Sequence, residues 1–273
     1  MNTYQLFESG YCYHCERMTL KTGSLTQRQY PALCVLINHP DKGYLLFDTG
    51  YTNRFFQLTH RLPYSLYRYL TPVTIKRSLK DQLVEKGIRP EDINYIVISH
   101  FHADHIGGLA DYPNAQFICH EDALEDVKGK KGFKALLQGF LPGLLPNDFY
   151  ERLRVLGGNP IELDPALQPF TVGFDIFDDK QLIAIALPGH AKGHIGLYVK
   201  GTQDAFFIGD SCWHQEAFQD LNLPSQLTYL VHDNKEHYLE SIQKLHQLYL
   251  KNKELLIIPS HCAHARELVG APR

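Results

Sequence analysis

The chain has 273 residues, which suits one large domain or two small ones and allows a core of ordinary size. Its 27 Lys and Arg residues and 30 Asp and Glu residues give a net charge of −3, which excludes a global positive field that would gather nucleic acid or anionic membrane. The amino terminus does not resemble a signal peptide, and no apolar run approaches the roughly 18 residues of a membrane span. We therefore predict a cytoplasmic protein, with no nucleic-acid or membrane partner, that acts on a small molecule.

The first predicted elements form a β-hairpin, because residues 33–37 and 44–47 are apolar runs joined by a turn-rich segment. The second run ends in Asp48, which is either a turn cap or a buried acceptor that orients metal-binding histidines. Residues 51–75 are rich in aromatic residues and arginine, and they predict a packing element, a pocket wall or a dimer surface. A helix is predicted over residues 78–85.

A group of ligand-type residues follows the next apolar run, residues 95–98. The group is His100, His102, Asp104 and His105. The β-branched run indicates a buried strand and a glycine pair closes the segment, so these side chains should lie at the carboxyl end of the strand, where open α/β sheets place their chemistry. Imidazole and carboxylate suit zinc and related ions, and a single ion seldom uses so many neighbours. The group therefore predicts two metal ions.

Residues 115–119 predict another strand, and a helix should start near Glu121. Residues 129–158 then break the alternation of strands and helices, because many Phe and Leu residues are interrupted by prolines. This segment is too apolar for a linker. It predicts helical pieces that cover the core as a cap, or additional core packing.

Three strands predicted in the second half of the chain each end in one ligand-type residue. These residues are His190 after residues 182–187, Asp210 after residues 205–208, and His261 after residues 255–258. A helix over about residues 235–250 precedes the last of these strands. Two half-chains of strands followed by helices predict two packed sheets with helices outside, a four-layer arrangement within one domain.

The order His-x-His-x-Asp-His, followed by His, Asp and His after three separate strands, resembles the signature of the metallo-β-lactamase superfamily. The resemblance covers most of the chain, from Asp48 to His261. It implies an αββα sandwich of the α/β class, here one hydrolase domain over residues 1–273 with insertions at about 51–75 and 129–158. The implied ligands are His100, His102 and His190 for one ion, Asp104, His105 and His261 for the other, and Asp210 as the bridge.

The same resemblance implies that Asp48 and His194 orient ligands. Two divalent ions, most readily zinc and otherwise iron, manganese or cobalt, can share a water and lower its pKa, so that a metal-bridging hydroxide attacks an ester or lactone bond. Asp104 would carry the proton to the leaving group in addition to its role as a ligand. Neither a Gly-x-Ser-x-Gly motif nor a phosphate-binding glycine loop offers a different chemistry.

Among the superfamily's enzymes the chain most resembles the N-acyl homoserine lactonases. True β-lactamases usually carry cysteine at the position of Asp210, and Cys212 follows two residues later. The alternatives are a thioesterase of the glyoxalase II type, a phosphodiesterase, and, outside enzymes, a non-catalytic ligand-binding regulator that retains the metal site. Glyoxalase II enzymes have a basic carboxyl-terminal region, and phosphodiesterases that act on transfer RNA have a basic arm. We find neither pattern in this sequence.

One departure from the lactonases concerns substrate chemistry. Trp213 stands where those enzymes carry a tyrosine whose hydroxyl assists the lactone carbonyl. Indole offers an N–H donor but cannot transfer a proton as a phenol does. The residues that could substitute for the tyrosine are Tyr13, Tyr51 and His214.

Overall fold

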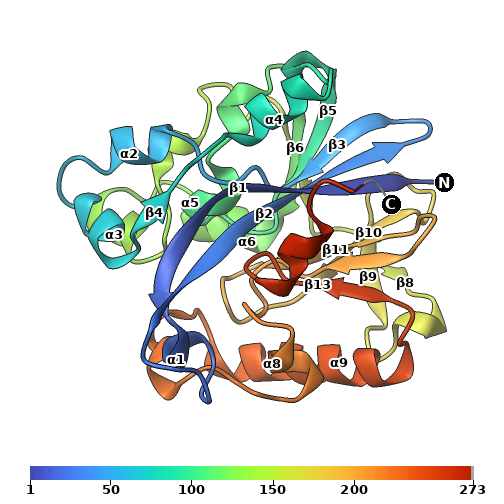
Figure 1. The fold of residues 1–273 in the computed structure, drawn as a ribbon. Helices are drawn as coiled ribbons and strands as arrows, with labels where there is room; N and C mark the ends of the chain where they lie inside the picture. Colours follow the sequence, from blue (N-terminus) through green and yellow to red (C-terminus); the bar gives the residue numbers. More distant parts are fainter. Residues whose placement is uncertain (272–273) are drawn as a thin grey trace.

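The computed structural model describes residues 1–271, and its larger sheet has seven strands (Figure 1). In spatial order they are β4 (Val73–Thr74), β1 (Thr3–Cys15), β2 (Gln27–His39), β3 (Gly43–Phe47), β5 (Ile93–Val97), β6 (Gln116–His120) and β7 (Leu153–Leu156). The pairs from β4 to β3 are antiparallel, whereas β3, β5, β6 and β7 run parallel. The carboxyl ends of all four parallel strands therefore lie on the same side of the sheet.

The smaller sheet has six strands. In spatial order they are β13 (Leu256–Ile258), β12 (Ala205–Phe207), β11 (Ile195–Val199), β10 (Leu182–Ala186), β9 (Val172–Asp175) and β8 (Ile161–Glu162). Only β12 and β13 are parallel, and the crossover between them contains the longest helix, α9 (Lys235–Lys251). The Asn234 side chain caps α9 by accepting a hydrogen bond from the backbone N–H of His237.

Short helices connect the strands. The α-helices are α1 (Glu16–Thr19), α2 (Arg54–Leu58), α3 (Ser65–Leu70), α4 (Leu79–Glu85), α5 (Ala103–Ile106), α6 (Glu121–Val127), α7 (Gly132–Leu136) and α8 (Glu216–Gln219). The 3-10 helices are η1 (Pro90–Asp92), η2 (Leu109–Asp111), η3 (Pro142–Leu144), η4 (Pro165–Leu167), η5 (Gln226–Val231) and η6 (His264–Leu268). Within residues 1–271, no helix combines the length and the apolar character needed to cross a membrane.

Three apolar layers separate four layers of secondary structure. Val97 of β5 and Phe207 of β12 pack between the two sheets, whereas Ile96 faces the helices outside the larger sheet and Phe206 faces α9 outside the smaller one. Successive side chains of a strand point to opposite faces, so a strand covered on both faces needs a continuous apolar run. This arrangement confirms the predicted αββα sandwich.

The segments predicted as insertions lie mostly outside the larger sheet. Residues 51–75 form α2, α3 and the edge strand β4. Residues 129–158 form α7 and η3 as helical pieces, but they end in β7, a strand at the other edge of the same sheet. Neither β7 nor the long strand β1, which pairs with β2 along most of its length, is among the strands predicted from the sequence.

Candidate metal centre

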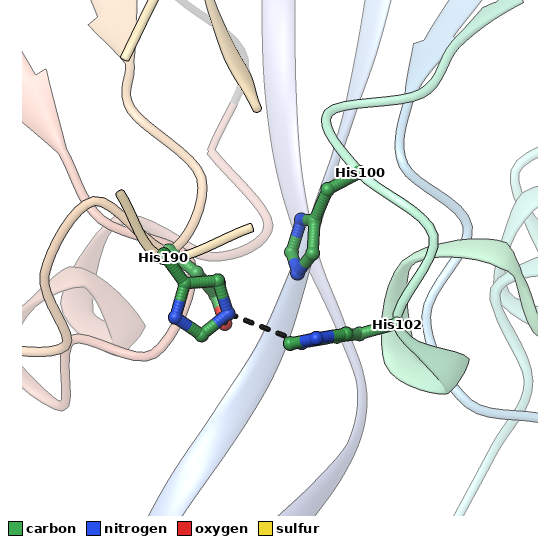
Figure 2. Close-up of side chains that lie close together, drawn as sticks. His100, His102 and His190 are labelled. Carbon is green, nitrogen blue, oxygen red and sulfur yellow. Dashed lines mark hydrogen bonds and ion pairs between the residues drawn. The ribbon is translucent and has the colours of Figure 1, made fainter. Parts of the chain in front are cut away.

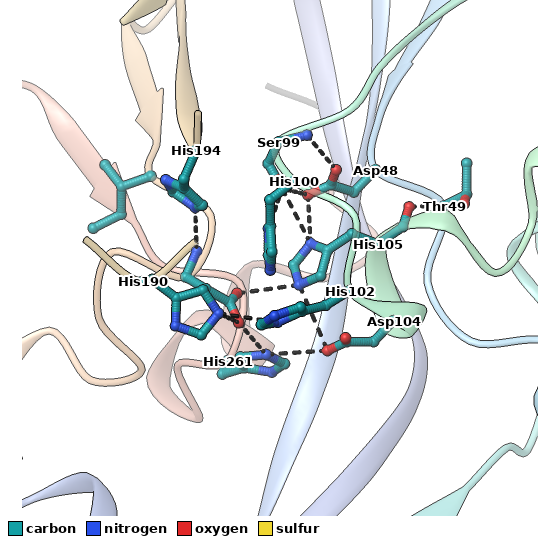
Figure 3. A network of polar contacts seen from close by, with 12 residues as sticks. Asp48, Thr49, Ser99, His100, His102, Asp104, His105, His190, His194 and His261 are labelled. Atoms are coloured by element: carbon teal, nitrogen blue, oxygen red, sulfur yellow. Dashed lines mark hydrogen bonds and ion pairs between the residues drawn. The ribbon is translucent and has the colours of Figure 1, made fainter. Parts of the chain in front are cut away.

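The ligand-type residues lie in loops and a short helix that follow strands of both sheets. Residues 98–102 connect β5 to α5, whose first turn carries Asp104 and His105. His190 follows β10, Asp210 follows β12 and His261 follows β13. Figure 3 shows the five histidines of this set and Asp104 approaching one another. The strand ends thus bring together all seven residues predicted as ligands, although they span more than half of the chain.

The seven side chains form two groups that share one carboxylate. The first group is His100, His102, His190 and Asp210, and the second is Asp104, His105, His261 and Asp210. Within each group, one ligand atom from each residue lies within 4.8 Å of all the others. The grouping of the side chains is the one that the resemblance to the superfamily implied, with Asp210 common to both groups.

In the first group the imidazole nitrogens face one another (Figure 2). His190 Nε2 lies 3.1 Å from His102 Nδ1 and 3.4 Å from an Asp210 oxygen. His100 Nε2 is buried, and no residue in the described part of the chain gives it a hydrogen-bond partner. An unpartnered buried nitrogen is costly, and a cation that accepts its lone pair removes that cost. The donor set therefore fits a divalent metal ion.

In the second group two carboxylates approach two imidazoles. His261 Nε2 lies 3.0 Å from Asp210 Oδ2 and 3.2 Å from Asp104 Oδ2. His105 Nε2 lies 3.2 Å from Asp210 Oδ1. All four side chains are buried, so their charges must be balanced within the group. Two oxygen and two nitrogen ligand types again fit a divalent cation.

Asp48 holds His105 in place. The Asp48 carboxylate accepts hydrogen bonds from His105 Nδ1 at 2.7 Å, from Ser99 Oγ at 2.7 Å and from the Ser99 backbone N–H at 2.8 Å. Because Nδ1 carries the proton, Nε2 of His105 is the nitrogen that faces Asp210. The structure therefore favours the second of the two interpretations of Asp48, a buried acceptor that orients a ligand-type histidine.

His194 acts on Asp210 in a similar way. The backbone N–H of Asp210 donates to His194 Nε2 at 3.0 Å, and His194 Nδ1 donates to the carbonyl of Leu187 at 3.0 Å. Both ring nitrogens are therefore used, and His194 has none left for a metal ion. Its position supports the role of an orienting residue that the sequence implied.

The electrostatics of the two groups differ. Burial lowers the pKa of His100 and of His190 well below the usual value, so both are neutral and their nitrogen lone pairs are available. Burial also opposes the charged form of His261, but Asp210 and Asp104 outweigh it and raise the pKa of His261 to about 10. The same pairing holds the pKa of Asp210 well below its usual range despite burial. The charged residues of the site are thus those of the second group, including Asp210, which the first group shares.

Trp213 lies directly beside the second group. Its ring centroid is 4.3 Å from that of His261, and Tyr30 and His14 pack against the indole at 5.1 and 5.3 Å. Sequence reasoning did not identify Tyr30 or His14 as neighbours of the site. His14 lies in β1 and Tyr30 lies in β2, in the region where these two strands pair. Their proximity could have been inferred from this pairing only if β1 had been predicted as a strand.

Two of the proposed substitutes for the lactonase tyrosine have hydrogen bonds elsewhere, whereas Tyr51 lies near Asp104, whose charge adds to the effect of burial in raising the pKa of Tyr51. His214 Nε2 shares a hydrogen bond with Thr19 at 2.9 Å, the hydroxyl of Tyr13 accepts one from Gln29 at 3.1 Å, and Tyr51 is a fully buried core residue. Cys212 packs in the apolar layer between the smaller sheet and α9. It is therefore a core residue, and Asp210 is the residue that belongs to the ligand groups.

One further histidine near the first group had no signal in the sequence. His232 follows η5, and its ring centroid lies 5.2 Å from that of His190. It packs against Tyr238 of α9 at 4.4 Å. The loop between two helices brings His232 to the site, and no strand or motif precedes it.

Residues 28–211, about two thirds of the chain, match the metallo-β-lactamase superfamily. The chain belongs to this superfamily. Among its curated members, an N-acyl homoserine lactonase of Rhizobium radiobacter is 25% identical over 186 residues, which are 66% of this chain and 62% of the lactonase. A probable metallo-hydrolase of Mycobacterium tuberculosis is 26% identical over 269 residues, 93% of this chain and 81% of that protein.

Two solved structures of lactone-hydrolysing enzymes have the same fold. An N-acyl homoserine lactone hydrolase with the product N-hexanoyl-L-homoserine at its catalytic metal centre has a TM-score of 0.73 and 18% identity over 97% of this chain and 95% of its own. A dizinc quorum-quenching lactonase has a TM-score of 0.67 and 15% identity, covering 96% of this chain and 88% of its own. The four-layer sandwich is thus that of metallo-β-lactamase superfamily enzymes.

Proposed function

We propose that this protein is a metal-dependent hydrolase of a single domain that opens an ester or lactone bond, as the N-acyl homoserine lactonases do. The observation that carries the proposal is the convergence of seven ligand-type side chains into two groups that share Asp210. Two such adjoining groups are the arrangement of a dinuclear hydrolase. The relatedness to lactonases named above supports the same reaction class.

His100, His102 and His190 would hold one ion, and Asp104, His105 and His261 the other, with Asp210 between them. Zinc is the ion that these nitrogen and oxygen donors suit best, although iron, manganese and cobalt accept the same donors. When bound, two such ions would polarise the carbonyl of the substrate and lower the pKa of a bound water, so that hydroxide is available at neutral pH. The chain itself supplies the rigid placement of the donors at strand ends and the hydrogen bonds that orient them.

Asp104 is the carboxylate best placed to move a proton. It is 7% exposed, whereas Asp210 is 2% exposed and Asp48 is fully buried. Asp104 Oδ2 faces His261 at 3.2 Å, so its ionised form is stabilised by a neighbouring imidazole. We assign to the ionised Asp104 carboxylate the acceptance of the proton that the attacking water loses and its transfer to the leaving oxygen, and to Asp210 the placement of both groups of ligands.

Trp213 forms a wall of the site beside His261. An indole N–H can donate a hydrogen bond to a substrate oxygen but does not transfer its proton. We therefore propose that Trp213 fixes the substrate and that proton transfer depends on Asp104. This division of roles favours esters and lactones whose leaving group needs only one proton donor.

The test combines metal content with a substrate panel. Purified protein should contain close to two equivalents of a transition metal, and a panel of lactones, carboxylic esters, thioesters and phosphodiesters should show turnover of the first two. His102→Ala should lose metal and activity, whereas His237→Ala, at an exposed position of α9, should retain both. Turnover of thioesters or phosphodiesters alone would favour a glyoxalase II type enzyme or a phosphodiesterase.

The rival from outside the enzymes is a regulator that binds a ligand at the metal centre without turnover. It predicts that a lactone stabilises the metal-loaded protein against thermal unfolding, while no member of the panel is hydrolysed. Protein without any transition metal, or a fully active His102→Ala variant, would contradict the hydrolase proposal.

A further inference from the structure

Two segments of this chain have a charge unlike that of the whole. Residues 49–80 contain six Lys and Arg residues, and residues 127–147 contain four, but neither segment contains a single Asp or Glu. The chain as a whole has a net charge of −3. These segments contain α2, α3 and α7 with their flanking residues, and together they hold ten of the 27 Lys and Arg residues of the chain.

The two segments lie side by side. The backbone N–H of Gly132, the first residue of α7, donates a hydrogen bond of 2.9 Å to the hydroxyl of Tyr64, which precedes α3. Gly143 of η3 lies against the side chain of Leu58 of α2. Figure 1 shows α2 and α3 together at one end of the molecule. The outer surface of α3, α7 and their flanking residues is called the cap face below.

Several cations of the two segments are already neutralised. Arg54 pairs with Asp111 at 2.7 Å, and Lys130 pairs with Asp126 at 2.9 Å. Those on the cap face are different, because no carboxylate of residues 1–271 lies within ion-pair distance of them. They are Arg61, Arg68, Lys131 and Lys134, all exposed. The cap face thus has a local positive charge that nothing in the described chain offsets.

The cap face also exposes large apolar side chains. They are Leu62, Tyr69, Leu70, Phe133 and Leu137. Tyr69 is 81% exposed and Leu137 is 83% exposed. Single exposed apolar residues are ordinary, but a set gathered on two neighbouring helices marks an interaction surface.

We propose that the cap face docks on an anionic lipid bilayer. Exposed aromatic and aliphatic side chains enter the boundary between headgroups and acyl chains, and unpaired cations next to them bind anionic headgroups. The observations require both kinds of residue, and a bilayer is the surface that engages both without directional contacts. The proposal concerns association with one leaflet and is independent of the hydrolase reaction. It replaces the sequence-based prediction of no membrane partner, which depended on the net charge of the whole chain and not on the charge of the cap face.

Other occupants fit the cap face less well. A second copy of the chain in a two-fold dimer would bring together two faces that each carry unpaired cations and no carboxylate, which is electrostatically unfavourable. Nucleic acid would match the charge but would leave Leu62, Leu70 and Leu137 without partners. A protein partner would need polar groups of both signs around the rim, and the two segments offer no carboxylate.

The cap face is connected to the candidate metal centre. The chain that leaves α7 reaches Gly139, whose backbone lies against the ring of His102. A bilayer bound at α3 and α7 would therefore adjoin the segment that covers the first group of ligands. Amphiphilic substrates would reach the site from the lipid phase, and this last point alone rests on the proposed function.

The docking is tested by sedimentation with vesicles. The full chain should sediment with vesicles of phosphatidylcholine mixed with phosphatidylglycerol and much less with phosphatidylcholine alone, and high salt should release it. The double variant Lys131→Glu/Lys134→Glu should weaken binding by about ten-fold or more, since it removes two attractions to anionic headgroups and adds two repulsions. Tyr69→Ser/Leu137→Ser should weaken it to a similar extent.

The matched control is Leu250→Ser/Lys251→Glu, which makes the same kinds of change at exposed positions of α9 on the opposite sheet. It should bind vesicles as the unmodified chain does. All variants should keep the thermal midpoint, the metal content and the hydrolysis of a short, water-soluble lactone, so a failed hydrolase proposal would leave this test intact. Absence of sedimentation, equal binding by the cap-face variants, or a dimer that Tyr69→Ser/Leu137→Ser dissociates would overturn the proposal.

Discussion

The backbone of Gly139 lies so close to His102 that a Cβ atom on residue 139 would come within 2.6 Å of Cδ2 of the histidine ring. Gly139 also has a φ of +61°, which L side chains rarely adopt. The segment after α7 therefore fixes the position of His102 from outside the larger sheet, at a distance that only glycine permits.

Gly139→Ala should displace the His102 ring and weaken the first group of ligands, lowering activity by at least about ten-fold, the loss seen when a ligand is misplaced. Gly129→Ala is the matched control, because Gly129 has a φ of +70° but nothing within 4 Å of its Cβ position. Both variants should lose about 1–2 kcal/mol of stability from the left-handed backbone. Urea unfolding and bound metal measured on both proteins check this, and equal activities would contradict it.

His194→Ala should weaken metal binding without removing a ligand. The backbone N–H of Asp210 would lose its acceptor, at a cost of about 1–3 kcal/mol for a buried unpaired donor, and the carboxylate would lose its orientation. We expect zinc affinity to fall about 10- to 100-fold, measured by competition with a coloured chelator. A zinc affinity as high as that of His237→Ala would show that His194 has only a packing role.

Asp48→Asn should affect the second group of ligands more than the first. Asparagine tolerates the left-handed backbone of this position, where φ is +60°, so the change isolates the hydrogen bonds. An amide cannot accept from His105 Nδ1 and from both Ser99 donors at once, and His105 would lose its orientation. We expect the protein to retain close to one equivalent of zinc. Metal analysis after gel filtration tests this, and retention of two equivalents would contradict it.

The cysteines should differ sharply in reactivity. Five of the six are buried, and burial raises the pKa of each of them, that of Cys119 to about 12. Only Cys15 is partly exposed. Because the thiolate is the reacting form, a disulfide reagent at neutral pH should modify one thiol quickly in the folded protein and all six in denaturant. Rapid modification of two or more would contradict the burial described.

The parts of the site that could be predicted from sequence are those in which a buried strand runs into a polar residue. Ile96 and Val97 face opposite apolar layers, so β5 needs an uninterrupted apolar run, and that run made the position of His100 recognisable. The same holds for Asp210 after β12 and His261 after β13. That these residues lie close together was predicted from the two-sheet fold and from the resemblance to the superfamily. The match to the superfamily over residues 28–211 confirms that resemblance.

Residues that approach the site from irregular or interrupted segments could not be predicted in this way. β1 contains Glu8, Ser9 and Gly10, and its register with β2 shifts there, so no regular alternation identifies it as a strand. The contact between His14 and Trp213 therefore could not be predicted. His232 comes from a loop whose path depends on the packing of η5 and α9.

Trp213 is the only tryptophan in the chain, and its ring lies 4.3 Å from that of His261. All indole fluorescence of the protein consequently comes from one residue in contact with the candidate metal centre. The emission spectrum is therefore a direct optical record of that centre, and occupancy, exchange between ions and arrival of a substrate can be followed in real time without an added label. Trp213→Phe would remove the indole emission, so this variant serves as the reference for the background fluorescence.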